Sequence, residues 1–305
     1  MRILVVANKT LSRNGVERVD QTYWNFYVPL VELGHEVFFY DTVNPTEKNF
    51  DKIVDTFKPE LVFSILTGNQ VVTPYEPIKE IKQLTKAGIV KTFNWFCDDT
   101  WRYETFSKNL CRFFFACSTP ERKYVEQYKR DGYQNILVGN WHINPDIVTK
   151  ASTKQFDIGF IGGLNSQRVK SLQNLSSLGF RMGNDSGVSH EDMYLLYSSS
   201  KIGLNLSVNE NDPEKKTQMK LRMFEVPATQ TMLLTEYHSG IEEYYKPEEE
   251  IVCFSNEDDM LQKLRYYLKA DSIREQIALA GYKKTIEEHN SKKRLGKLIK
   301  EIEAL

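Results

Sequence analysis

The chain has 305 residues, of which 41% are hydrophobic and 27% are charged, and its formal net charge is -1. These values are ordinary for a folded globular protein and exclude a disordered chain, a collagen-like repeat or a coiled coil over the whole length. The near-zero charge gives no basis for a nonspecific grip on nucleic acid. The length allows two domains, each with its own core.

The first half of the chain alternates short apolar runs with helical periodicities, which predicts an open parallel sheet with helices on both faces. An apolar stripe from Val19 to Leu30 predicts the first helix, and Gly34 ends it. The pattern then repeats, so we expect one doubly wound, Rossmann-like α/β domain over residues 1–145. Its six predicted strands are 2–7, 36–41, 60–66, 89–96, 113–118 and 135–140.

A second α/β alternation is predicted over residues 146–290, after a polar linker around residues 142–155 that contains Pro145. Its predicted strands are 156–163, 201–207, one inside 220–245, and 251–255. Two such domains in tandem suggest a ligand cleft between the carboxyl edges of their sheets.

The last segment, 291–305, is predicted to be an amphipathic helix with the apolar stripe Leu295, Leu298, Ile299 and Ile302. We expect it to pack back toward the N-terminal domain. Lys and Arg outnumber Glu here, so a weak peripheral contact with an anionic membrane is the alternative.

Membrane segments and metal sites have no support in the sequence. Only five apolar residues follow Arg2, and no later run is long enough to cross a bilayer, so we expect a cytoplasmic protein with no integral membrane segment. The four cysteines lack CxxC spacing and His partners, which favours buried thiols in a reducing compartment. The P-loop, GxGxxG, HExxH and GxSxG motifs are also absent.

The stretch KLRMFEV (220–226) carries the most informative charges. Lys220 and Arg222 fall in the first turns of a predicted helix, where unpaired N–H groups and the helix dipole favour an anion such as a diphosphate. The Glu225 carboxylate could accept hydrogen bonds from both hydroxyls of a ribose. Two simpler alternatives stay open: the cations are merely solvated, and Glu225 pairs locally with Lys or Arg.

Several segments of the second half, taken together, form a family signature. They are FDIGFIGG (156–163), LYSSSKIGLNLS (196–207), KLRMFEVPATQTMLLTEYHSGIEEYY (220–245), EEIVCFSNEDDMLQKLRYYL (249–268) and REQIALAGYKKTIEEHN (274–290). This order resembles the C-terminal domain of GT-B glycosyltransferases, and it is most similar to the CgeB-like branch of the group 1 (family 4-like) transferases.

The resemblance implies a GT-B fold, in which two Rossmann-like domains face across a cleft and the second holds a nucleoside diphosphate sugar as donor, UDP-linked by expectation. It implies no tightly bound cofactor and no metal. It implies that Glu225 holds the donor ribose and that Lys220 and Arg222 lie near the diphosphate. The nucleotide base of the donor is expected near the loop 183–190. Other expected donor contacts are Gly162, Gly163, Arg168, His238 and Gly240.

One position departs from the family pattern. Many family 4 members carry a second glutamate eight positions before the ribose-binding one, and here that position is Thr217. The CgeB-like branch often lacks that glutamate, so the departure does not exclude activity, but it puts the mechanism and the stereochemistry of transfer in question.

The acceptor side is expected in the first domain, where the segments 8–15, 66–70 and 94–102 follow predicted strands. Asp98 and Asp99 are the candidates for a general base, next to Trp95 and Trp101, which could stack on a sugar. The alternative is that the two aspartates cap or turn the chain before a short helix.

Three functions follow from these patterns. The first is a glycosyltransferase that moves a sugar to an acceptor hydroxyl; the second is a non-catalytic sugar-nucleotide-binding protein; the third is a GT-B-shaped nucleotide-sugar epimerase. The acceptor could be a polysaccharide, a protein, a small molecule or a modified DNA base.

Overall fold

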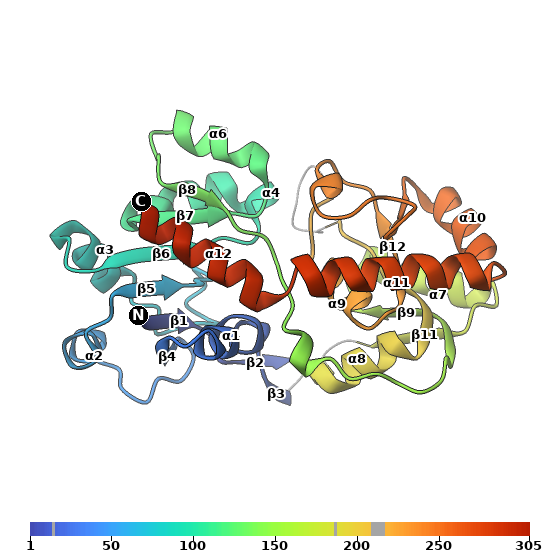
Figure 1. Ribbon diagram of the computed structural model, residues 1–305, viewed down its shortest axis with the longest axis horizontal. Helices are drawn as coiled ribbons and strands as arrows, with labels where there is room; N and C mark the ends of the chain where they lie inside the picture. The colour runs from blue at the N-terminus through green and yellow to red at the C-terminus, as the bar shows by residue number, and fades with distance from the viewer. Residues whose placement is uncertain (14–15, 186–187, 209–216) are drawn as a thin grey trace. The chain divides into compact units, whose positions relative to one another are not determined.

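A computed structural model describes residues 1–13, 16–185, 188–208 and 217–305 of the chain. Its contacts divide the chain into two compact units (Figure 1). Unit 1 comprises Met1–Asn140 and Ser291–Leu305, and unit 2 comprises Trp141–Asn290. The chain therefore leaves unit 1 after Asn140, a few residues before the expected boundary at residue 145, and returns to it after Asn290.

The sheet of unit 1 has six parallel strands in the order β4-β1-β5-β6-β7-β8, which confirms the predicted number and the doubly wound pattern. In β1 every residue after Arg2 is buried, as expected for a central strand of a parallel sheet that is covered on both faces. The strands are β1 (Arg2–Ala7), β4 (Glu36–Asp41), β5 (Leu61–Ser64), β6 (Lys91–Trp95), β7 (Ala116–Thr119) and β8 (Ile136–Val138).

The helices of unit 1 begin and end at residues suited to these positions. The Asn49 side chain accepts from the Lys52 N–H and starts α2, and Gly88 ends α3 in the left-handed region at φ 64°. The helices are α1 (Val28–Glu32), α2 (Phe50–Phe57), α3 (Ile78–Ala87), α4 (Asp99–Arg102), α5 (Lys108–Leu110), α6 (Arg122–Arg130) and α12 (Ser291–Ala304).

Two features near the N-terminus differ from the sequence-based prediction. The predicted loop 8–15 contains the strand β2 (Thr10–Arg13), which pairs antiparallel with β3 (Val16–Val19) directly after that loop, with Thr10 opposite Val19. Residues 14 and 15 of that predicted loop lie outside the described residues. Val19 is therefore in a strand, and the helix begins as a π-helical segment at Tyr23. The apolar stripe alone could not separate a strand ending from a helix beginning.

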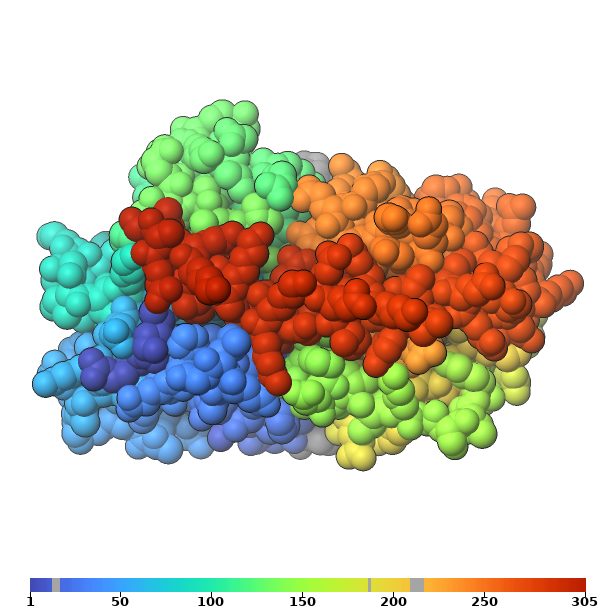
Figure 2. Space-filling view, in the orientation of Figure 1, coloured from blue at the N-terminus to red at the C-terminus, as the bar shows by residue number. Residues whose placement is uncertain are grey.

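The C-terminal helix α12 belongs to unit 1 and lies at its surface (Figures 1 and 2). Its predicted apolar stripe is buried: Leu295, Leu298, Ile299 and Ile302 are at most 6% exposed. The Lys91 ammonium donates to the carbonyl oxygens of Ile302 at 3.1 Å and Glu303 at 2.9 Å, so a cation satisfies the end of the helix.

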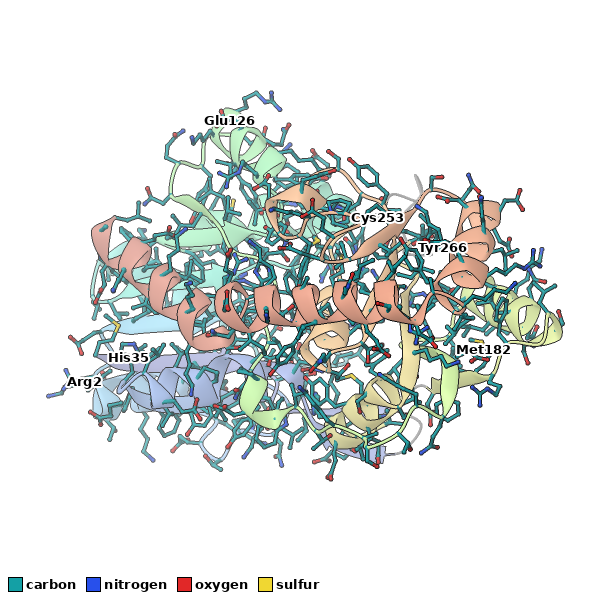
Figure 3. All side chains as sticks on the ribbon, turned by 45° about the vertical axis from the view of Figure 1, so that its right-hand side comes forward. Arg2, His35, Glu126, Met182, Cys253 and Tyr266 are labelled. Carbon is teal, nitrogen blue, oxygen red and sulfur yellow. The ribbon has the colours of Figure 1, made fainter. Side chains whose placement is uncertain are left out.

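Unit 2 contains a five-stranded parallel sheet in the order β10-β9-β11-β12-β13. The strands are β9 (Phe156–Ile161), β10 (Met182–Asp185), β11 (Ser200–Asn205), β12 (Met232–Glu236) and β13 (Val252–Phe254). The edge strand β10 was not predicted, because part of it was assigned to the loop 183–190. Residues 186 and 187 of that loop lie outside the described residues. Met182 of β10 and Cys253 of β13 are labelled in Figure 3.

The helices of unit 2 are α7 (Ser166–Ser177), α8 (His190–Ser198), α9 (Arg222–Ala228), α10 (Glu257–Tyr267) and α11 (Asp271–Glu288). All seven residues of α9 are buried, including Arg222 and Glu225. No helix in the described part of the chain is both long enough and apolar enough to cross a membrane.

Two helical glycines give a matched test of packing. A Cβ at Gly281 in α11 would lie 2.3 Å from the backbone oxygen of Glu250, whereas a Cβ at Gly296 in α12 would meet only Leu33, at 3.9 Å. Alanine in a helix interior is favoured over glycine by about 0.5–1 kcal/mol, but a core clash costs about 1–3 kcal/mol. Gly281→Ala should therefore lower, and Gly296→Ala raise, the free energy of unfolding in denaturant titrations. Equal stabilisation by both changes would contradict the close approach at Gly281.

Candidate functional site

The carboxyl ends of the parallel strands in unit 2 lie along one edge of the sheet, and the loops that follow β9, β11 and β12 start there. This edge brings together the predicted donor residues. After β9 come Gly162 and Gly163, and then Arg168 in the first turn of α7. Lys220 precedes α9, and Arg222 is the first residue of that helix. After β12 come His238 and Gly240.

Arg222 is buried rather than solvated, with only 9% of its surface exposed. Its Nη1 donates to the side-chain oxygen of Asn205 and, at 3.3 Å, to the carbonyl oxygen of Leu206. The guanidinium lies 5.0 Å from the ring centroid of Phe160. A Cβ on Gly162 would lie 2.6 Å from Arg222 Nη2, so only a glycine lets the loop after β9 rest against this cation.

Arg168 also contacts the loops that follow β9 and β11. Its Nη1 donates to the Gly163 carbonyl at 2.9 Å, and its Nη2 donates to Leu206 at 2.9 Å and Val208 at 3.3 Å. The side chain therefore fixes the loop after β9 to the loop after β11.

Glu236, the last residue of β12, adds an acceptor to this network. Its Oε2 accepts from the backbone N–H and, at 2.9 Å, the hydroxyl of Ser207, and from the Val208 N–H at 3.1 Å. Three loops at the sheet edge are thus joined by charged hydrogen bonds that do not depend on a ligand.

Glu225 lies inside this unit, one turn after Arg222, and is 5% exposed. Burial raises the pKa of its carboxyl to about 7, and the nearby Arg222 charge opposes that effect. The Arg222 charge is therefore part of the environment of Glu225, and ribose binding and local pairing with Lys or Arg both stay open as its role. A carboxyl group with this pKa changes its charge near neutral pH, as groups in ligand sites often do.

The other predicted donor residues have different surroundings. Lys220 precedes α9, and its carbonyl accepts from the Met223 N–H at 2.9 Å. His238 is 4% exposed, with Nδ1 3.1 Å from the Ser239 carbonyl oxygen. Gly240 has φ 96°, a left-handed conformation that requires glycine in practice. Thr217, at the position of the missing glutamate, donates to the Tyr237 carbonyl at 3.1 Å.

The two candidate base residues of unit 1 differ sharply. Asp98 is half-buried at the N-cap position of α4, at the carboxyl edge of the sheet, and its side chain makes no capping hydrogen bond. Asp99 is 0% exposed, and its Oδ2 accepts from the Tyr128 hydroxyl at 3.0 Å. Burial raises the pKa of the Asp99 carboxyl to about 6.

The prediction that Trp95 lines a sugar-stacking pocket beside these aspartates is wrong. That side chain is 1% exposed and packs in the core, with its ring centroid 5.0 Å from that of Phe26. As the last residue of β6, it points into the interior and cannot stack on a sugar. Trp101 is half-buried.

Among the described residues, no group of three or more His, Cys, Asp or Glu side chains could hold a metal ion. The four cysteines form no disulfides; Cys111, Cys117 and Cys253 are buried, and Cys97 is half-buried.

Sequence reasoning missed Asn205 and Glu236. Both are polar residues at the ends of apolar strands, and that strand-end position was the signal that could have identified them.

Residues 152–300 match the family described as "Glycosyl transferase-like". This segment contains all the strands of unit 2 and the network around Arg222. None of the curated protein sequences matches the chain.

Several solved structures superpose on nearly the whole chain. Sucrose-phosphate synthase from Thermosynechococcus elongatus does so with a TM-score of 0.69 at 11% identity, over 99% of both chains. HepE from Anabaena, in complex with UDP and glucose, gives a TM-score of 0.68 at 10% identity, over 100% of both chains. The DNA-modifying enzyme β-glucosyltransferase, studied with and without uridine diphosphoglucose, gives 0.61 at 14% identity, over 99% of this chain and 100% of the other.

These comparisons do not bear on the CgeB-like branch, which stays a prediction. At such low identities the superpositions establish the fold, and the predicted fold class is confirmed. Residues 152–300 thus match the glycosyl transferase-like family, and the chain has the GT-B fold of glycosyltransferases, with two Rossmann-like units and a C-terminal helix.

Proposed function

We propose that this protein is a glycosyltransferase that moves a sugar from a nucleoside diphosphate sugar, a UDP-sugar in the first instance, to an acceptor hydroxyl. The observation that carries the proposal is the buried Glu225, one turn after Arg222 in α9, with the network of loops that Arg222 joins at the carboxyl edge of unit 2. The family match over this unit and the UDP complex of HepE support the same class of donor.

In this proposal the Glu225 carboxylate accepts hydrogen bonds from the ribose hydroxyls. The diphosphate lies at the loop Gly162–Gly163 and the N-terminus of α7, where backbone N–H groups and the helix dipole favour an anion. A Cβ at Gly163 would meet nothing within 4 Å, which supports a close approach of ligand to this backbone. Lys220, His238 and Gly240 are further donor contacts.

The two arginines contribute mainly by fixing this loop. Arg168 already gives hydrogen bonds to three carbonyl oxygens, and Arg222 is buried behind Gly162. Their charges still lower the energy of an anion at the loop, and the leaving diphosphate gains negative charge during transfer. Such fixed charges stabilise the transition state without rearranging.

For the acceptor we propose Asp98 as the general base. Asp98 is partly open to solvent at the sheet edge. Asp99 is fully buried and accepts a hydrogen bond from the Tyr128 hydroxyl. A general base must come within hydrogen-bond reach of the acceptor hydroxyl, which favours the more accessible carboxyl group of the pair. Asp99 therefore has a structural role in this proposal.

One observation favours a second candidate, a sugar-nucleotide-binding protein without transferase activity. Thr217 replaces the second glutamate of the family pattern, and its hydroxyl is bonded to the Tyr237 carbonyl. Incubation with a panel of nucleotide sugars separates the candidates. Release of nucleoside diphosphate supports a transferase, and binding without release supports the second candidate. If no nucleotide sugar binds and no nucleoside diphosphate is released, both candidate functions are wrong.

We also propose that the basic face of α12 contacts an anionic membrane surface. A shallow groove of about 600 Å³ on this helix is lined by Lys292, Lys293, Lys297 and Lys300, with Glu301 as its acidic residue. Its net positive charge matches an anionic lipid surface.

Glu225→Gln should weaken UDP binding about 10- to 100-fold, because hydrogen bonds to a charged acceptor contribute about 1.5–3 kcal/mol. Isothermal titration calorimetry at pH 8, where Glu225 is ionised, provides the measurement. Glu275→Gln, at an exposed site on α11, is the matched control and should bind like the wild type. Equal affinity of the Glu225 variant and the control would contradict the proposed role.

Asp99→Asn should change the pH dependence of stability. The folded state raises the pKa of Asp99 from 3.8 to about 6, so the stability due to its proton is complete below about pH 4 and is lost as the pH rises through 6. The asparagine side chain is neutral at every pH. The free energy of unfolding of the variant, relative to that of the wild type, should therefore rise over this pH range by at most about 3 kcal/mol. Denaturant titrations between pH 4 and 7 measure it, and parallel profiles of the two proteins would contradict the burial of a titrating carboxyl group.

Replacing Lys293, Lys297 and Lys300 by Glu should abolish cosedimentation with vesicles that contain phosphatidylglycerol. Binding of the wild type should be absent with pure phosphatidylcholine and should fall with salt, because it is electrostatic. If the wild type does not sediment with either vesicle, the membrane proposal is wrong.

A further inference from the structure

Tyr194 on α8 carries a hydroxyl group that the fold does not use. Its side chain is 0% exposed, and the phenol oxygen has no hydrogen-bond partner within the described residues. Tyr197, one turn further, differs: its hydroxyl accepts from the Ile161 N–H at 3.1 Å and donates to the Ile161 carbonyl at 3.2 Å. A buried hydroxyl without a partner costs free energy, and phenylalanine would fill the same space without that cost. We therefore look for a state of the protein in which this hydroxyl forms a hydrogen bond.

The neighbouring helix α9 carries a buried carboxyl group, Glu225. Helix α8 packs against α9, and both Tyr194 and Glu225 are buried there. Burial raises the pKa of the Tyr194 phenol, and the Glu225 charge raises it further, as it also does for Tyr197. Arg222 is the cation that acts on Glu225. Other titratable groups on this side of α9, Tyr244, Tyr245 and His289, have their rings around Phe224, and Cys253 belongs to the same buried core.

We infer that Tyr194 is a positioning residue for Glu225: when Glu225 is ionised, the Tyr194 hydroxyl donates a hydrogen bond to its carboxylate and holds it for the donor ribose. The inference rests on the proposed function, which gives Glu225 the ribose contact.

The chemistry of the neighbours supports this assignment. A buried carboxylate needs donors to replace lost water, whereas the neutral acid needs them much less. Arg222 supplies charge, but its Nη1 already donates to Asn205 and Leu206. The Tyr194 hydroxyl is a donor with no competing partner among the described residues. It can stabilise the ionised form at no cost to another interaction.

Donor binding should therefore depend on pH. With a carboxyl pKa of about 7, the ionised fraction of Glu225 rises about tenfold between pH 6 and pH 8, and UDP affinity should rise with it. Removal of the Tyr194 hydroxyl should move this rise to higher pH.

The test is Tyr194→Phe, with two measurements from pH 5.5 to 9. The first is the titration of the Glu225 side-chain carboxyl by carbon-13 NMR, assigned with Glu225→Gln, and the second is UDP affinity by calorimetry. Both midpoints should rise by about one pH unit, as expected for loss of one hydrogen bond to a charged group. Thermal stability at pH 5.5 should be unchanged or higher, since an unpaired hydroxyl has been removed.

The matched control is Tyr267→Phe on α10, whose hydroxyl donates to Glu248 at 2.9 Å, and it should leave both midpoints unchanged. A purely structural role for Tyr194 would change stability and leave the midpoints in place, and that result would overturn the inference. If UDP does not bind the wild type, the proposed function is wrong, while the NMR midpoint still decides whether Tyr194 acts on Glu225.

Discussion

The burial of one cation, Arg222, is the interaction on which the candidate site depends. A guanidinium is costly to remove from water, and here the cost is offset by Asn205, Leu206 and the face of Phe160. These partners come from the ends of two neighbouring strands, so the charge can be satisfied only if β9, β11 and α9 are correctly registered. The same charge opposes the effect of burial on Glu225.

A second consequence concerns the loops. Arg168 and Glu236 connect the segments after β9, β11 and β12 through hydrogen bonds to backbone groups. A phosphate or ribose arriving at this edge would meet backbone that is already ordered, and less conformational entropy would be lost on binding. Preorganised charge of this kind is suited to stabilising a leaving diphosphate when a sugar is transferred from a nucleotide sugar.

Much of the fold was predictable because it depends on local patterns. Apolar runs bounded by helical stripes gave the six strands of unit 1, and the stripe from Leu295 to Ile302 gave α12. The short strands β2, β3 and β10 were missed, since each has only four residues and little apolar character. The residues of the donor site stay a prediction, and their surroundings could not be predicted in detail. Asp98 and Asp99 are identical in type, and residues far along the chain, such as Tyr128, 29 residues after Asp99, distinguish their environments. Arg222 was expected to face a ligand, and its burial depends on Phe160 and Asn205, which no local pattern connects to it.

The central claim is that unit 2 binds the nucleotide part of a sugar donor through its ribose. Calorimetric titration of the full chain at pH 8 with UDP and with 2′,3′-dideoxy-UDP tests it most directly, because the two ligands share base and diphosphate. The account predicts that UDP binds and that the dideoxy analogue binds at least about tenfold more weakly, the loss expected for hydrogen bonds to a carboxylate. Equal affinity for the two ligands, or no binding of UDP, would contradict it.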